Sequence, residues 1–258
     1  MPFFTINGLT HYFGGLRAVS NFNLSMESGE LVGLIGPNGA GKTTVFNLIS
    51  GIYKPGQGGI VFRNESIAGL APHAVNRKGI ARTFQNIRLF HDMSIIDNIK
   101  VAARSRTGYG LASSLFHPPR FWTKEHELDA WCRDLLAIFG LDAKAPLRSS
   151  SLAYGQQRRL EIARAIATQP SLLLLDEPAA GMNPNEAKEL IDTILWVKDR
   201  FDLTMLIIEH NMRVIMEVSQ RIVVLDFGET IAQGPPAHIR NDPRVIEAYL
   251  GKEDTHAA

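Results

Sequence analysis

The chain has 258 residues, of which 45% are hydrophobic and 21% are charged, enough to bury the core of one large domain. Its 27 basic and 26 acidic residues give a net charge of +1, so the basic excess of a nucleic-acid-binding protein is lacking and we expect no nucleic-acid partner. The single cysteine, Cys132, excludes an intrachain disulfide and fits a reducing compartment. No secretory signal is visible, and the longest apolar runs are too short to span a bilayer, so we expect a soluble chain or one that a partner holds at a membrane.

The N-terminal part of the chain predicts strands followed by a helix. Residues 3–7 and 19–26 alternate in part between apolar and polar side chains, as antiparallel edge strands do. Residues 31–35 form a continuous apolar run, which is typical of a parallel strand covered on both faces. A helix is expected directly after a short loop, over residues 42–49.

The middle of the chain predicts helices. Residues 86–151 show helical patterns and no strong strand, and apolar side chains recur at helical spacing over residues 125–139. Residues 108–123 hold Gly, Ser, Pro and aromatic residues and predict a loop, which either docks a membrane partner or packs as an ordinary loop. We therefore expect a single domain over residues 1–258, with residues 86–151 as an inserted helical subdomain.

The C-terminal part returns to strands. Apolar runs at residues 172–175 and 205–208 predict two more buried parallel strands, each followed by an acidic residue. Residues 221–226 and 229–233 flank a Phe-Gly turn and predict a hairpin. Alternating strands and helices are typical of an α/β fold, here with a mainly parallel core sheet and an antiparallel β edge.

A phosphate-binding loop is the most specific motif. Residues 36–43 match the pattern G-x-x-x-x-G-K-[ST] between a predicted strand and a predicted helix. Glycines let backbone N–H groups approach phosphate oxygens, and the helix N-terminus adds partial positive charge. We expect Lys42 to reach the outer phosphates and the Thr43 hydroxyl to bind Mg²⁺; a chance Gly-rich turn is the alternative. The residues expected to hold the nucleotide here are Gly36, Pro37, Asn38, Gly39, Ala40, Gly41, Lys42, Thr43 and Thr44.

An acidic pair follows the strand at residues 172–175. Ligands of open α/β sheets bind at the carboxyl ends of strands, which is where Asp176 and Glu177 lie. Asp176 would hold Mg²⁺, and Glu177 would polarise the attacking water, since phosphoryl transfer needs positioning and charge. Without the phosphate loop, a solvated strand end would be the simpler interpretation.

A second helix start that could accept phosphate lies at residues 152–165. Gly155 comes just before a helix whose apolar positions Leu160, Ala163 and Ile166 share one face. One nucleotide does not need two such sites in one chain. Seen alone, the segment would be a plain amphipathic helix.

Taken in order, the motifs resemble the ATP-binding cassette of ABC transporters, from about residue 3 to residue 250. The exact residues of segments 82–90, 152–165 and 175–184 resemble those of the LivG-type ATPase subunits of branched-chain amino acid importers. The elements that carry the resemblance are the phosphate loop, Gln85, the Leu-Ala-Tyr-Gly-Gln segment at 152–156, the acidic pair, and His210.

The resemblance implies a role for single residues. Phe13 matches the aromatic residue that stacks on adenine, although from the sequence it could equally be a core residue. Gln85 matches the residue that touches Mg²⁺ and the water, and His210 matches the histidine that contacts the γ-phosphate. Lys42, Glu177 and His210 are thus expected to be catalytic, and Thr43, Gln85 and Asp176 to bind the metal. The signature residues Ala153, Gly155 and Gln156 are expected to contact a nucleotide held by another cassette.

Two positions depart from the family pattern. Ala153 stands where the family usually has Ser, so the hydroxyl that binds the partner's γ-phosphate is absent. Asn183 ends the loop that crosses to the partner cassette, where Asp is common. Both changes bear on how strongly two cassettes close on ATP.

The resemblance also implies a setting. ATP and Mg²⁺ would be the cofactors, and the partners would be transmembrane permease subunits and a second ATPase subunit, of LivF type or a copy of this chain, paired head to tail. A periplasmic solute-binding protein would take part indirectly, and the chain would lie on the cytoplasmic face of the inner membrane. The cargo would be branched-chain amino acids or related amino acids and amides. The alternatives are an ATPase of another ABC system such as lipopolysaccharide export, a soluble ABC ATPase acting on nucleic acid or ribosomes, and a nucleotide sensor that does not hydrolyse ATP.

Overall fold

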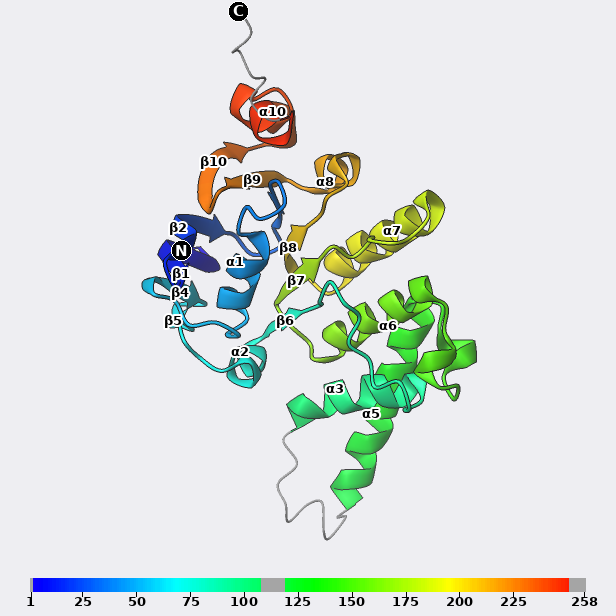
Figure 1. Cartoon of the computed structure of the whole chain (residues 1–258). Coiled ribbons are helices and arrows are strands. Elements are labelled where there is room, and N and C mark those ends of the chain that lie inside the picture. The colour runs from blue at the N-terminus through cyan, green and yellow to red at the C-terminus, as the bar shows by residue number, and fades with distance from the viewer. Residues whose placement is uncertain (1, 108–118, 251–258) are drawn as a thin grey trace, which may run out of the picture.

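The computed structural model describes residues 2–107 and 119–250, which form two sheets with helices packed around them (Figure 1). One sheet has six strands in the order β10-β9-β3-β8-β7-β6. Its strands are β3 (Leu31–Ile35), β6 (Ile80–Arg82), β7 (Leu172–Asp176), β8 (Thr204–Ile208), β9 (Arg221–Asp226) and β10 (Glu229–Gly234). The other sheet has four antiparallel strands in the order β2-β1-β4-β5. They are β1 (Phe4–Phe13), β2 (Leu16–Met26), β4 (Gln57–Phe62) and β5 (Glu65–Ser66).

The helices vary from one turn to five turns in length. The α-helices are α1 (Lys42–Ile49), α2 (Pro72–Lys78), α3 (Ile95–Thr107), α5 (Pro119–Ile138), α6 (Tyr154–Ala167), α7 (Pro184–Arg200), α8 (Met212–Val218), α9 (Pro236–Ile239) and α10 (Pro243–Leu250). Two single turns of 3-10 helix follow α5, namely η1 (Asp142–Lys144) and η2 (Ser149–Ser151). No helix among the described residues is both long enough and apolar enough to cross a bilayer.

The six-stranded sheet is parallel except for β10, and its central strands are buried on both faces. β3, β7 and β8 have no exposed residue, which confirms the three strands predicted from continuous apolar runs. Alternate residues of each strand point to opposite sides: Leu173 and Leu175 join one hydrophobic cluster, whereas Leu172 and Leu174 join the other. The predicted α/β fold with a mainly parallel core sheet is confirmed, and so is the β9–β10 hairpin.

The antiparallel strands differ in one respect from the prediction. β1 and β2 pair as expected, but they belong to a sheet of their own with β4 and β5 rather than to the edge of the parallel sheet. The sequence does not reveal β4 because it begins Gln-Gly-Gly, and glycine weakens the strand signal. β6 is missed because three residues are too few to establish a period.

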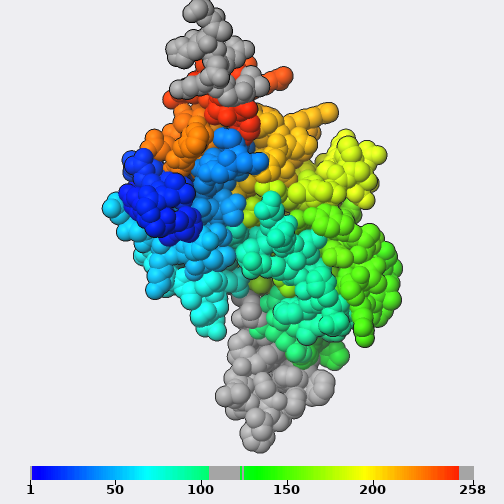
Figure 2. All heavy atoms as spheres, in the orientation of Figure 1, coloured from blue at the N-terminus to red at the C-terminus, as the bar shows by residue number. Residues whose placement is uncertain are grey.

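Residues 86–151 contain helices and turns in the part that the structure describes, apart from an isolated bridge between Ser94 and Arg148. The helix predicted over 125–139 exists but begins earlier, at Pro119, a residue favoured in the first turn of a helix. The loop predicted over 108–123 is therefore wrong for residues 119–123, and the rest of it lies outside the described residues. In Figure 2 the teal and green atoms that follow β6 lie beside the blue and cyan sheet region.

A candidate nucleotide-binding and catalytic site

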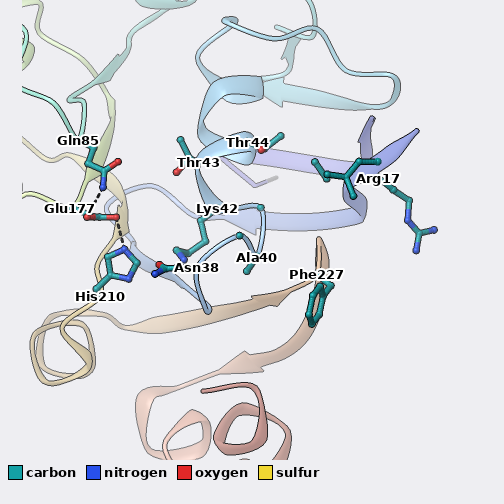
Figure 3. Close-up of a pocket in the computed structure, with 14 residues that line it drawn as sticks. Arg17, Asn38, Ala40, Lys42, Thr43, Thr44, Gln85, Glu177, His210 and Phe227 are labelled. Carbon is teal, nitrogen blue, oxygen red and sulfur yellow. Dashed lines mark hydrogen bonds and ion pairs between the residues drawn. The ribbon is translucent and has the colours of Figure 1, made fainter. Parts of the chain in front are cut away.

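A cavity of about 560 Å³ opens at the carboxyl ends of β3 and β7 (Figure 3). Its walls come from the phosphate loop, the start of α1, the start of β2, and the segments that follow β6, β7, β8 and β9. The lining residues are Leu16, Arg17, Ala18, Asn38, Gly39, Ala40, Gly41, Lys42, Thr43, Thr44, Gln85, Glu177, His210 and Phe227. The structure therefore brings together four elements that lie far apart in the sequence: the phosphate loop, Gln85, Glu177 and His210.

The phosphate loop depends on a glycine at a crowded position, Gly41. Gly41 has φ 102°, and a Cβ there would lie 2.5 Å from the Ala18 carbonyl oxygen, so another residue would be strained and would clash. α1 begins directly after Gly41, and no side chain caps it among the described residues. Its first N–H groups are thus left for an anion, and the helix dipole favours negative charge there.

Lys42 is held inside the loop. Its ammonium donates to the Gly36 carbonyl at 2.7 Å and to the Pro37 carbonyl at 2.9 Å. Burial lowers the pKa of Lys42, while the charges of Glu177 and Asp176 oppose the shift. The lysine therefore faces both the loop and the acidic pair, where an outer phosphate would replace the carbonyl partners.

Glu177 lies between two polar partners on the side of the cavity opposite Phe227 (Figure 3). The imidazole Nε2 of His210 is 2.6 Å from one carboxylate oxygen, and the Gln85 amide nitrogen donates to the other at 3.2 Å. Glu177 has φ 49°, a conformation that costs free energy for a residue with a side chain. Glu177 directly follows the fully buried strand β7, and its carboxylate points toward Gln85 and His210.

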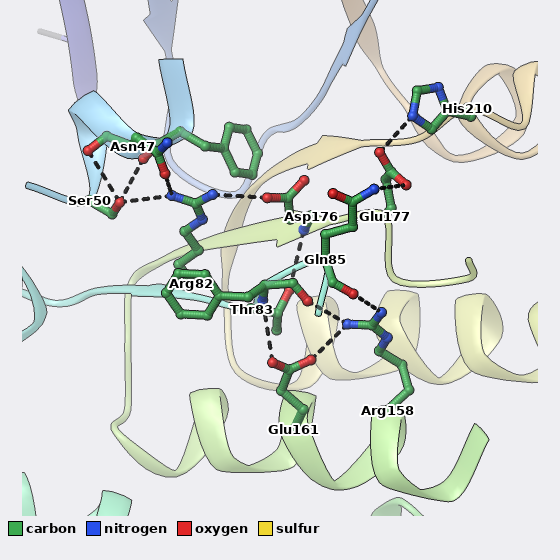
Figure 4. A network of polar contacts seen from close by, with 12 residues as sticks. Asn47, Ser50, Arg82, Thr83, Gln85, Arg158, Glu161, Asp176, Glu177 and His210 are labelled. Atoms are coloured by element: carbon green, nitrogen blue, oxygen red, sulfur yellow. Dashed lines mark hydrogen bonds and ion pairs between the residues drawn. The ribbon is translucent and has the colours of Figure 1, made fainter. Parts of the chain in front are cut away.

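Asp176 is buried and does not line the cavity. Its Oδ2 pairs with the Arg82 guanidinium at 2.9 Å, and both side chains are almost fully covered. Arg82 also donates to Asn47 at 2.7 Å and to Ser50 at 3.0 Å, both at the end of α1 (Figure 4). Burial raises the pKa of Asp176, and the pairing with Arg82 opposes that shift.

A second buried pair joins α6 to the segment that carries Gln85. Arg158 is 2.8 Å from Glu161 and donates to the backbone carbonyls of Phe84 at 2.6 Å and Gln85 at 2.7 Å (Figure 4). Glu161 in turn accepts from the backbone N–H groups of Phe84 and Arg88. The Arg158 and Glu161 side chains are themselves buried, and together they hold α6 to the backbone of residues 84–88, which includes Gln85.

The donor set around the acidic pair fits Mg²⁺. The ion prefers oxygen ligands, and this site offers the Thr43 hydroxyl, the Gln85 amide oxygen and the Asp176 carboxylate. Gln85 uses its nitrogen toward Glu177, which leaves its oxygen free for another partner. Asp176 uses Oδ2 toward Arg82, and its Oδ1 accepts no hydrogen bond from the described residues.

Six of the expected nucleotide contacts do not line the cavity, namely Phe13, Gly36, Pro37, Ala153, Gly155 and Gln156. Phe13 ends β1, is 43% exposed, and packs edge-to-face against Tyr53. The cavity is lined instead by Leu16, Arg17 and Ala18 at the start of β2. Ala153 is the N-cap of α6 and is exposed. Gly155 lies inside the first turn of α6, so the prediction that it comes before the helix is wrong. The Gln156 side-chain oxygen accepts a hydrogen bond from Lys144 at 2.9 Å. Their roles toward a nucleotide stay predictions.

The sequence interpretation missed several residues that shape the site. Arg82 is one of them: it ends β6, whose three residues are too few to establish a period, so the sequence gives no sign of its pairing with Asp176. Phe227 lines the cavity with 86% of its surface exposed, and no pattern in the sequence distinguishes it from an ordinary turn residue.

Comparison with known proteins decides the family. The family described as "ABC transporter" matches residues 19–180, and the one described as "Branched-chain amino acid ATP-binding cassette transporter" matches residues 229–255. The chain belongs to the ABC transporter ATP-binding family. Its activity is that of an ABC ATPase, ATP hydrolysis coupled to transport.

Individual relatives agree with this assignment. The chain is 47% identical over 251 residues to the high-affinity branched-chain amino acid transport ATP-binding protein LivG of Escherichia coli K12, covering 97% of this chain and 98% of that one. It is 45% identical over 251 residues, with the same coverage, to BraF of Pseudomonas aeruginosa, which bears the same description. A crystal structure of an ABC transporter ATP-binding cassette in its ADP conformation superposes with a TM-score of 0.84 at 30% identity, covering 98% of this chain and 100% of that one.

Proposed function

We propose that this chain is the ATP-hydrolysing subunit of an importer of branched-chain amino acids, with Glu177 as the general base. The observation that carries the proposal is the position of Glu177, fixed by His210 and Gln85 at the edge of the cavity that the phosphate loop forms. A carboxylate so placed polarises a water for attack on the γ-phosphate, and phosphoryl transfer depends mainly on such positioning.

The remaining residues supply charge and orientation. Lys42 exchanges its bonds to the loop carbonyls for phosphate oxygens, which neutralises charge that grows in the transition state. His210, 45% exposed, leaves its side of Glu177 to contact the γ-phosphate. Bound Mg²⁺ would be held by Thr43, Gln85 and Asp176 and would draw charge from the phosphate oxygens.

We propose that two cassettes pair head to tail, each nucleotide lying between one phosphate loop and the other chain's signature residues. Support comes from the position of Ala153, Gly155 and Gln156 outside the cavity, at the accessible start of α6. A helix start that accepts phosphate has no nucleotide to bind within its own chain. The second cassette is a LivF-type subunit or a copy of this chain.

The helical segment over 86–151 is proposed as the subdomain that passes motion to transmembrane permease subunits. Support comes from Glu161 of α6, which accepts from the backbone N–H of Arg88 in this segment and pairs with Arg158. Arg158 in turn donates to the backbone carbonyl of Gln85, whose side chain touches Glu177. The chain would lie on the cytoplasmic face of the membrane, and a periplasmic solute-binding protein would deliver the cargo to the permease.

The cargo is proposed from relatives, since an ATPase subunit does not touch it. LivG and BraF are described as branched-chain amino acid transport proteins, and related amino acids or amides are the nearest variants. Uptake of labelled leucine by a strain lacking this chain tests the proposal. We expect the deletion strain to lose leucine uptake, and the wild-type chain to restore it where Lys42→Ala does not. Normal leucine uptake together with a leaky outer membrane in the deletion strain would point to lipopolysaccharide export instead.

Pairing is tested by the dependence of hydrolysis on concentration. If the chain pairs with itself, the phosphate released per chain rises with chain concentration until pairing is complete. If the second cassette is a different subunit, release stays low at every concentration and rises when the co-purified subunit is added. A high rate that is independent of concentration and of any added subunit would contradict the two-cassette site.

A further inference from the structure

The first amide of the phosphate loop is held by the far end of the chain. β3 ends at Ile35, and the backbone N–H of the next residue, Gly36, donates to the Tyr249 hydroxyl at 2.8 Å, across 213 residues of sequence. Gly36 itself is buried and pressed against β9, since a Cβ there would lie 2.0 Å from the Leu225 carbonyl oxygen. The place where the loop leaves the sheet is thus fixed from both sides.

This amide needs the tyrosine. The parallel ladder between β3 and β9 stops at Ile35 and Val224, so the sheet offers Gly36 no acceptor of its own. The Tyr249 hydroxyl is the acceptor that the described residues provide. A buried backbone N–H without a partner is unfavourable, so removing the hydroxyl leaves the loop without its anchor.

Tyr249 lies in the last turn of α10, and this helix contacts both sides of the site. In Figure 2 the red atoms of α10 adjoin blue atoms of the N-terminal half, as the bond to Gly36 requires. On its other side, Tyr249 lines a groove with Met212 and Met216 of α8, the helix that follows His210 after one residue. The C-terminal helix is therefore bonded to the phosphate loop and lines a groove together with the helix that follows His210.

We propose that Tyr249 is a positioning residue for ATP binding, because its hydroxyl fixes the phosphate loop in the conformation that receives phosphate. The loop binds through several backbone N–H groups that have to point at one place, and a loop ordered in advance loses less entropy when ATP binds. The C-terminal helix then contributes to the affinity for nucleotide without touching it. The inference rests on the nucleotide site but not on the pairing of two cassettes.

The test is Tyr249→Phe, which removes one oxygen and keeps the ring. ATP affinity is measured on the isolated chain by calorimetry, and amide hydrogen exchange is followed residue by residue without nucleotide. We expect ATP to bind about fivefold more weakly, the effect of one lost hydrogen bond. We also expect the Gly36 amide to exchange faster while amides of β7 and β8 keep their protection.

Tyr12→Phe is the matched control, because Tyr12 is an exposed tyrosine on β1 that does not line the cavity. It should change neither affinity nor exchange. The proposal is overturned if Tyr249→Phe binds ATP as the wild type does with unchanged Gly36 exchange. It is also overturned if exchange accelerates equally in β7, since the hydroxyl would then stabilise the fold in general. Failure of the wild type to bind ATP would instead contradict the nucleotide site itself.

Discussion

Arg82 and Asp176 form an ion pair of 2.9 Å between side chains that are 4% and 2% exposed, and Asp176 directly precedes Glu177, which lines the cavity. Asp176 is the residue expected to bind Mg²⁺, and Arg82 occupies one of its oxygens while it reaches α1 through Asn47 and Ser50. One guanidinium thus ties the ends of β6, β7 and α1 together. Arg82 thus holds the Asp176 carboxylate through Oδ2, while Oδ1 accepts no hydrogen bond from the described residues.

Arg82→Ala should destabilise the chain strongly. Removing one partner of a buried pair leaves an uncompensated charge, which typically costs about 3–5 kcal/mol. Urea unfolding, compared between wild type and variant, measures the difference. Arg133→Ala is the control, since it breaks an exposed pair with Asp129 and should cost less than about 1 kcal/mol. Equal free energies of unfolding in the two variants would show that the buried Arg82–Asp176 pair stabilises the fold no more than an exposed pair does.

Lys42→Ala should weaken ATP binding while the fold persists. A hydrogen bond to a charged group contributes about 1.5–3 kcal/mol, so we expect roughly a tenfold to hundredfold rise in Kd. Calorimetric titration of the isolated chain measures it, with Lys188→Ala on the exposed face of α7 as the control. Unaltered affinity in Lys42→Ala would count against the phosphate-loop assignment.

Asn183 caps the N-terminus of α7, so substitutions there should affect stability according to how well the new side chain caps a helix. Its side chain accepts from the backbone N–H groups of Asn185 and Glu186, and the Glu186 carboxylate accepts from the Asn183 N–H. Asp caps as well as Asn does, so Asn183→Asp should leave stability nearly unchanged, whereas Asn183→Ala should cost about 1 kcal/mol. Thermal unfolding separates them. A large loss of stability in Asn183→Asp would mean that the added negative charge matters more than the cap.

Cys132 is fully buried in α5, and burial raises the pKa of its thiol from 9.0 to about 11. The unfolded thiol ionises first, so its contribution to stability is present below pH 9 and is lost as the pH rises toward 11. Stability relative to Cys132→Ala should decline across that window, as measured by urea unfolding. Native Cys132 should also resist thiol reagents at pH 8, and labelling at the rate of a free thiol would contradict its burial.

The sequence predicts those parts of the fold whose signals are local. β3, β7 and β8 are continuous apolar runs, and the phosphate loop carries its own residue pattern. Contacts between distant segments left no such signal. Arg82 finds its acid 94 residues later, and Tyr249 finds Gly36 across 213 residues, so both depend on the order of strands in the sheet. β4 and β6 were missed because glycine and shortness remove the period that sequence patterns rely on.

Glu177 is central to this account, because its placement separates a catalytic site from one that merely binds nucleotide. The most direct measurement is phosphate release and ATP affinity of Glu177→Gln in the purified native complex, with Glu189→Gln at the exposed pair with Arg159 as the control. We predict ATP affinity close to that of the wild type and release at least about a hundredfold slower, the scale of general base catalysis. Release at the parental rate would contradict the assignment of Glu177 as the base.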